Sequence, residues 1–122
     1  MKFSHLILSL TLALTSAATF ASDYLTIQLK DGPVVIKLSP EVAPQNVARI
    51  KALATAGKYN DVAFHRVIDG FMAQTGDVQF GNLRKGLDAT RVGTGGSDAP
   101  DLPAEFSNIP FDRGVVGMAR SN

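Results

Sequence analysis

The chain has 122 residues, with 12 basic and 11 acidic side chains, a formal charge of +1 and no cysteine. This length allows one domain at most, and without cysteine there can be no disulfide, no thiolate nucleophile and no cysteine-based metal site. Because the sequence contains no block of basic residues, we expect no nucleic-acid partner.

The first 21 residues are typical of a secretory signal peptide. Lys2 supplies a positive charge, an apolar run extends from Leu6 to Leu14, and Thr19-Phe20-Ala21 offers small residues to a signal peptidase. We expect cleavage after Ala21, with Ser16-Ala17-Ala18 as a second candidate site, and export to the periplasm. The apolar run is short for a membrane span, and the alternatives are an N-terminal membrane anchor or a buried helix.

A β-hairpin and a helix are predicted next. Apolar and polar residues alternate over residues 24–30 and again over 34–38, on either side of an Asp31-Gly32 turn pair. A helix is expected to start near Pro44, with Ser39 or Asn46 as its cap, and to end at Gly57 in a left-handed conformation. Its apolar residues recur at helical spacing, so we expect them to pack on a sheet as core; they are Val47, Ile50, Leu53 and Ala54.

The most informative stretch runs from Phe64 to Asp77 and has the sequence FHRVIDGFMAQTGD. Two apolar runs meet at Asp69-Gly70, which predicts a second hairpin. Because side chains alternate along a strand, Arg66 and His65 are expected on opposite faces. One guanidinium among apolar side chains, with the amide of Gln74 nearby, suits a site for an uncharged and partly apolar ligand. The alternative is a salt-bridged or snorkelling arginine with a purely structural role.

The rest of the chain contains few regular patterns. Frequent glycines predict a loop over residues 78–102, and its Gly93-Thr94-Gly95-Gly96 run lacks the Gly-Lys-Ser/Thr ending of a phosphate-binding loop. Residues 114–119 predict another strand. No Ser/His/Asp order, no carboxylate pair in a motif and no set of metal ligands indicates a hydrolase or a nuclease.

The FHRVIDGFMAQTGD stretch resembles the signature of the cyclophilin family of peptidyl-prolyl cis-trans isomerases, F-H-R-hydrophobic-I-x-G-F-M-x-Q-x-G-D. The similarity covers most of the chain from about Tyr24 onward and includes Gly93-Thr94-Gly95-Gly96, Glu105-Phe106 and residues 114–119. Asp69 and Thr75 depart from the pattern, since many members have proline and glycine there.

The resemblance implies a mainly β fold, an eight-stranded antiparallel barrel capped by two helices. About five strands and one helix can be counted in this chain, and the family's second helix, final strands and N-x-x-x-S-Q-F-F-I-like run have no counterpart before Asn122. We therefore expect residues 22–122 to be a partial cyclophilin-type domain that lacks the C-terminal third.

The resemblance also implies an activity, the cis-trans isomerisation of X–Pro bonds during protein folding, with Arg66 as hydrogen-bond donor to the prolyl nitrogen. Phe71 and Met72 would hold the proline ring, and Gln74 would bond the substrate backbone. The other groove positions are Ile68, Gly93, Ala119 and Arg120, the last standing where the family commonly has asparagine.

The resemblance implies no cofactor and no metal, and the expected partners are proline-containing polypeptides. We expect a monomer without stable membrane association once the signal is removed. Two alternatives remain: a proline-peptide-binding or holdase module without turnover, and an inactive truncated fragment.

Overall fold

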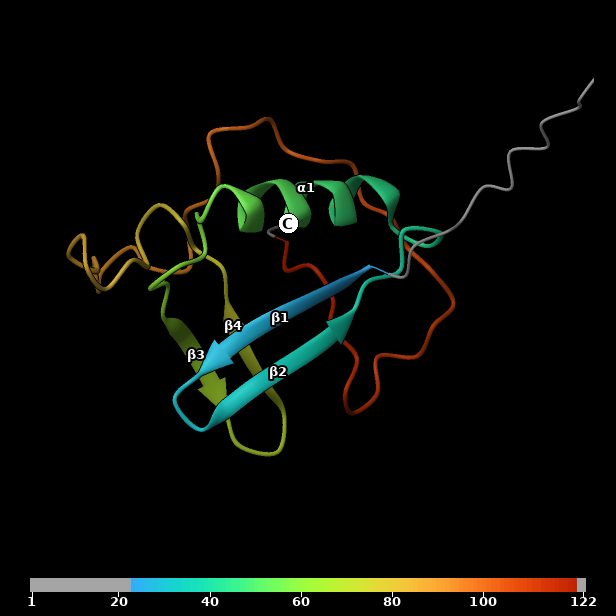
Figure 1. Ribbon diagram of the computed structural model, residues 1–122, viewed down its shortest axis with the longest axis horizontal. Helices are drawn as coiled ribbons and strands as arrows, with labels where there is room; N and C mark the ends of the chain where they lie inside the picture. Colours follow the sequence, from blue (N-terminus) through green and yellow to red (C-terminus); the bar gives the residue numbers. More distant parts are fainter. Residues whose placement is uncertain (1–22, 121–122) are drawn as a thin grey trace, which may run out of the picture.

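The computed structural model describes residues 23–120, so the predicted signal segment lies outside the described residues. Four strands and one helix follow each other along this part of the chain (Figure 1). They are β1 (Tyr24–Leu29), β2 (Gly32–Lys37), α1 (Pro44–Thr55), β3 (Phe64–Ile68) and β4 (Met72–Thr75).

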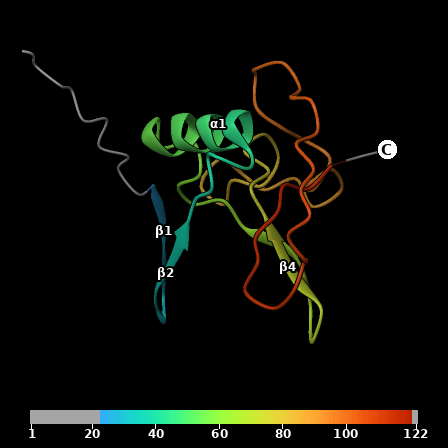
Figure 2. The ribbon, with the colours of Figure 1, turned by 90° about the vertical axis from the view of Figure 1, so that its right-hand side faces the viewer.

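The strands form two separate antiparallel hairpins, β1–β2 and β3–β4. Figure 2 shows them as two distinct ribbons below α1. The fold is mainly β with one helix, as predicted, but the described residues hold four strands rather than about five. Because the two hairpins share no strand pairing, they do not close a barrel within residues 23–120.

The β1–β2 hairpin has the predicted alternation but a shifted turn. Leu29 pairs with Gly32, so the turn residues are Lys30 and Asp31 rather than Asp31 and Gly32. Leu25 and Ile27 are half-buried, whereas the residues between them are exposed. The face that carries Leu25 and Ile27 is therefore only partly covered, since Leu29 and Val34 on the same face are 38% and 45% exposed.

The start of α1 differs from the prediction that Ser39 or Asn46 caps it. The N-cap residue is Ala43, which has no side-chain hydrogen bond, and Pro44 follows in the first turn. The free N–H groups are bonded by Glu105 instead, whose carboxylate accepts from the backbone nitrogens of residues 45 and 46 at 3.1 and 2.8 Å. A carboxylate at this position also suits the positive end of the helix dipole.

The body and the end of α1 agree with the prediction. Val47 is 8% exposed and is the only buried apolar side chain among residues 23–120, while the rest of the predicted stripe is half-buried. Gly57 has φ +70°, and the N–H of Lys58 bonds the carbonyl of Leu53, so the helix ends in a Schellman motif. No helix in the described part of the chain is both long and apolar enough to cross a membrane.

The strand predicted over residues 114–119 is wrong. This segment begins in a turn at Gly114 and is otherwise irregular and unpaired, and its Val116 and Met118 are 65% and 51% exposed. A strand needs a neighbour to bond its backbone, and no other strand of residues 23–120 lies beside this one. The apolar pattern was present, but its pairing partner was not.

Candidate functional site

The β3–β4 hairpin places a guanidinium and an amide directly opposite each other. Arg66 pairs with Gln74, and Ile68 pairs with Met72 two positions along. Residues two apart on a strand lie on the same face, so these four side chains share one face of the hairpin. Alternation along each strand predicted Arg66 beside Ile68 and Met72 beside Gln74, and the observed register brings the two pairs together.

A β-bulge changes the position of His65. The register shifts between Phe64 and Arg66, which leaves His65 without a residue opposite it on β4. A bulge bends its strand and redirects the side chains next to it. His65 therefore lines the same hollow as Arg66, and the prediction that the two residues lie on opposite faces is wrong.

This hollow, which we call the arginine hollow, has a volume of about 540 Å³ and is open to solvent. It is formed by β3, β4, the loop at residues 92–94 and the end of the described chain. Its lining residues are His65, Arg66, Gln74, Val92, Gly93, Thr94, Ala119 and Arg120.

Five of the eight predicted site residues meet in the arginine hollow: Arg66, Gln74, Gly93, Ala119 and Arg120. The other three are not among its lining residues. Ile68 and Met72 lie farther along the hairpin, and Phe71 lies in the turn with 76% of its surface exposed. The hollow thus contains the polar part of the predicted site, while the apolar part lies toward the tip of the hairpin.

The buried carboxylate of Asp77 holds residues 92–96, which we call the glycine loop, against the hairpin. Asp77 is only 4% exposed. Its Oδ1 accepts hydrogen bonds from the backbone N–H groups of Gln79 and Phe80 at 3.0 and 2.8 Å. The other oxygen accepts those of Gly93 and Gly95 at 2.7 and 3.1 Å. Asp77 therefore ties the end of β4 to the wall of the arginine hollow.

These four bonds also set the charge state of Asp77. Burial alone would raise the pKa of this carboxyl, but the N–H donors of residues 80, 93, 95 and 79 together outweigh burial and lower the pKa below its ordinary 3.8. No role of Asp77 was predicted from the sequence. The available signal was an aspartate directly before a turn, where its side chain can bond nearby backbone N–H groups.

Two positions in the loop require glycine. Gly93 has φ +96°, and a Cβ added there would lie 3.0 Å from the His65 imidazole. A Cβ on Gly95 would lie 2.5 Å from Oδ1 of Asp77. His65 packs against Gly93 with its Nδ1 buried and without a hydrogen-bond partner in the described chain. The close approach of loop and hairpin thus depends on missing side chains.

Arg120 enters the arginine hollow from an exposed segment. Its guanidinium lies over the ring of Phe106, 5.4 Å from the ring centroid, a distance typical of a cation–π contact. Arg66 and Arg120 are the two permanently charged groups of the lining.

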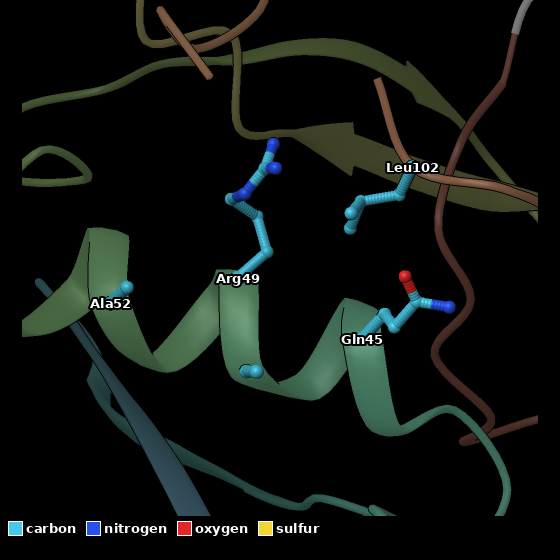
Figure 3. Close-up of a pocket in the computed structure, with 5 residues that line it drawn as sticks. Gln45, Arg49, Ala52 and Leu102 are labelled. Carbon is cyan, nitrogen blue, oxygen red and sulfur yellow. The ribbon is translucent and has the colours of Figure 1, made fainter. Parts of the chain in front are cut away.

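A second concavity, of about 360 Å³, lies between α1 and the segment that follows the glycine loop (Figure 3). Arg49 extends from α1 and donates to Ser97 Oγ at 3.3 Å and to the carbonyl of Pro100 at 2.9 Å. Its guanidinium therefore fastens the two segments together. The remaining lining residues are Gln45, Ala48, Ala52 and Leu102. They bring no set of polar groups together, so we interpret this concavity as a gap between two packed segments rather than a binding site. No three His, Cys, Asp or Glu side chains of residues 23–120 gather as metal ligands would.

Comparison with known proteins decides the family. The family model described as "Cyclophilin type peptidyl-prolyl cis-trans isomerase/CLD" matches residues 24–122. The chain belongs to the cyclophilin-type peptidyl-prolyl cis-trans isomerase family. The resemblance found in the FHRVIDGFMAQTGD stretch is thereby confirmed.

Curated relatives of this cyclophilin-type chain have consistent names. A "Probable peptidyl-prolyl cis-trans isomerase" from Brucella suis is 60% identical over 114 residues, and one from Brucella melitensis is equally similar. A "Peptidyl-prolyl cis-trans isomerase-like 2" from Cryptococcus neoformans is 48% identical over 104 residues, which is 80% of this chain and 16% of that protein. The Brucella alignments cover 93% of this chain but 58% of the relatives' length. No solved structure matches the chain significantly.

Proposed function

We propose that this cyclophilin-type chain accelerates the cis-trans isomerisation of X–Pro peptide bonds, with Arg66 as the hydrogen-bond donor to the prolyl nitrogen. The observation that carries the proposal is the pairing of Arg66 with Gln74 on one hairpin face, beside an open hollow. An open site suits a polypeptide substrate, which must enter with its chain extending on both sides of the proline.

The chemistry requires no bond to be made or broken. Rotation about a peptide bond faces a barrier of about 18–20 kcal/mol, because the C–N bond has partial double-bond character. In the twisted state the prolyl nitrogen loses this conjugation and becomes a better hydrogen-bond acceptor. A fixed donor that bonds the nitrogen more strongly in the twisted state than in either planar state lowers the barrier.

Arg66 suits this role because a guanidinium is always charged and holds its donors in a rigid plane. Gln74, directly opposite, carries an amide that can bond both N–H and C=O groups of the peptide backbone. Met72 lies on the same face and Phe71 in the adjoining turn, and we assign these two side chains to the proline ring. Gly93 and Ala119 would border the peptide without projecting bulky side chains.

The expected partners are unfolded or folding polypeptides that contain proline. Slow X–Pro exchange, over tens to hundreds of seconds, limits the folding of such chains, so an isomerase assists their folding. We propose that the chain acts as a monomer after export to the periplasm and cleavage after Ala21. This part of the proposal rests on the charged, apolar and small-residue regions of residues 1–21.

A peptide-binding or holdase module without turnover is the second candidate. Large apolar side chains favour it, because Phe71, Phe106 and Phe111 are 76%, 82% and 75% exposed and could hold unfolded segments. Such a module would use the same surfaces, but it would not lower the rotational barrier.

Exchange NMR spectroscopy on an Ala-Pro test peptide separates the two candidates. An isomerase at a small fraction of the peptide concentration produces cross-peaks between cis and trans signals on a timescale of a second or less. A binding module shifts or broadens the peptide signals but produces no such cross-peaks. Absence of both effects would contradict both candidates.

A further inference from the structure

The arginine hollow is positively charged to an extent that its proposed reaction does not require. Arg66 and Arg120 both line it, and none of its eight lining residues is an aspartate or a glutamate. One guanidinium is enough to donate to a prolyl nitrogen. The second is therefore free for another part of the substrate.

Several other basic side chains of the structure have acidic partners, and these two do not. Four ion pairs occur among residues 23–120: Lys30–Asp31, Lys51–Asp23, Arg84–Asp61 and Arg91–Asp88. Within the same residues neither Arg66 nor Arg120 lies within ion-pair distance of a carboxylate. The contact of Arg120 with the ring of Phe106 leaves its N–H donors available at the edge of the guanidinium plane.

Two carboxylates beside the loop wall of the hollow, Asp77 and Asp88, are already engaged. Asp77 is buried and its two oxygens accept the four backbone N–H groups described above. Asp88 bonds Thr90 and forms an ion pair with Arg91 at 2.6 Å. Neither can neutralise the two arginines without giving up these bonds, and the lining itself carries two positive charges and no negative one.

We propose that Arg120 is a specificity-determining residue, and that the arginine hollow prefers X–Pro substrates with a carboxylate side chain within about two residues of the proline. An extended peptide advances about 3.3 Å per residue, so such a side chain stays close to the hollow while Arg66 engages the prolyl nitrogen. A guanidinium holds a carboxylate with two parallel hydrogen bonds. The proposal rests on the proposed isomerase function and names its substrate class.

The test compares matched peptides that differ in charge beside the proline. One series carries Glu, Gln or Lys directly before the proline, and a second series carries them directly after it. The readout is the ratio of kcat/KM for the Glu peptide to that for the Gln peptide, so that any uniform loss of activity in a variant cancels. We expect a preference of about twofold to fivefold for Glu in at least one series, in the range of exposed ion pairs, and a disfavoured Lys peptide.

Variants assign the preference to Arg120. Arg120→Gln should reduce the ratio to about one, and Arg120→Lys should restore part of it because the charge returns without the bidentate geometry. Arg113→Gln removes an exposed arginine that does not line the hollow and should leave the ratio unchanged. Raising the salt concentration should also reduce the preference, because salt screens exposed charges.

The outcomes distinguish this proposal from the isomerase function itself. Equal kcat/KM for the Glu and Gln peptides in both series, or an unchanged preference in Arg120→Gln, would overturn the role of Arg120 and leave the isomerase function standing. If the chain accelerates the isomerisation of no peptide, the isomerase function fails. NMR titration with the same peptides then tests the charge preference by binding alone. Tighter binding of Glu peptides that is lost in Arg120→Gln would support the charge preference, and equal binding would overturn it.

Discussion

Arg66 and Gln74 illustrate what strand alternation can predict at the scale of single residues. The period of two along FHRVIDGFMAQTGD, with a turn at Asp69-Gly70, predicted the Gln74 amide near Arg66, and the observed register pairs the two residues. The same rule misplaced His65, because a bulge inserts one residue into the register. No local sequence signal marks that bulge. At the bulge, His65 contacts Gly93 of the glycine loop, which lies more than 25 residues farther along the chain.

Gly93→Ala should damage the site through a single methyl group. The added Cβ would lie 3.0 Å from the His65 imidazole, and φ +96° disfavours any side chain, so we expect a loss of about 1–3 kcal/mol in stability together with lower kcat/KM. Gly96→Ala is the matched control, since a Cβ there meets no atom within 4 Å. Thermal unfolding and peptide kinetics measure both effects. Equal behaviour of the two variants would contradict the close packing of loop and hairpin.

Asp77 and Glu105 determine the structure at the scale of elements. Each carboxylate bonds backbone N–H groups of a distant segment, Asp77 those of the glycine loop and Glu105 those of the first turn of α1. The sequence predicted the helix and its glycine end, which depend on local pattern. It predicted the wrong N-terminal cap, because the group that bonds there lies 59 residues from Asn46, beyond the reach of any local rule.

Asp77→Asn should loosen the loop while keeping the shape of the side chain. The amide has one oxygen instead of two, so two N–H groups lose their acceptor and face an NH₂ donor. Each buried N–H left unsatisfied costs about 1–3 kcal/mol, and we expect a clearly lower Tm at pH 7. Hydrogen exchange should become faster at one pair of N–H groups, either Gly93 and Gly95 or Gln79 and Phe80, depending on which oxygen the NH₂ group replaces.

The same variant has a pH signature with a definite sign. The pKa of Asp77 is lower in the folded chain than its ordinary 3.8, so the carboxylate stabilises the fold above about pH 4 and this contribution is lost as the pH falls below that value. When the pH is lowered from 5 to about 2.5, the Tm of Asp77→Asn should therefore fall less than the Tm of the unmodified chain. Asp88, whose pKa is lowered to about 2, and Glu105 act in the same direction in both proteins. Parallel pH curves of Tm would contradict this role of Asp77.

At the scale of the whole molecule, the described residues bury very little. Val47 is the only buried apolar side chain among residues 23–120, and many large apolar side chains are exposed. The sequence predicted a mainly β chain with one helix, but it also predicted a strand over residues 114–119. That pattern is compatible with a strand and has no pairing partner here. The chain spans 58% of the length of its Brucella relatives.

The exposed apolar surface should be detectable in solution. We expect the chain to bind the dye ANS with a strong rise in fluorescence, and to unfold in urea with a broad transition, because little apolar surface becomes newly exposed. Replacing both Phe106 and Phe111, 82% and 75% exposed, with serine should reduce the dye signal without lowering Tm. A chain that ignores ANS and unfolds sharply would contradict this description of the molecule.

The most direct test of the account is the isomerisation rate of an X–Pro peptide with the purified chain, with Arg66→Ala and with Arg84→Ala. Arg84 is the matched control, since its exposed guanidinium pairs with Asp61 at 3.0 Å outside the arginine hollow. We predict that the unmodified chain accelerates the reaction, that Arg66→Ala loses about 10²–10³-fold in kcat/KM as expected for a donor to the transition state, and that Arg84→Ala keeps its activity. No acceleration by the unmodified chain, or equal activity of the two variants, would contradict the claim that Arg66 in this hollow catalyses prolyl isomerisation.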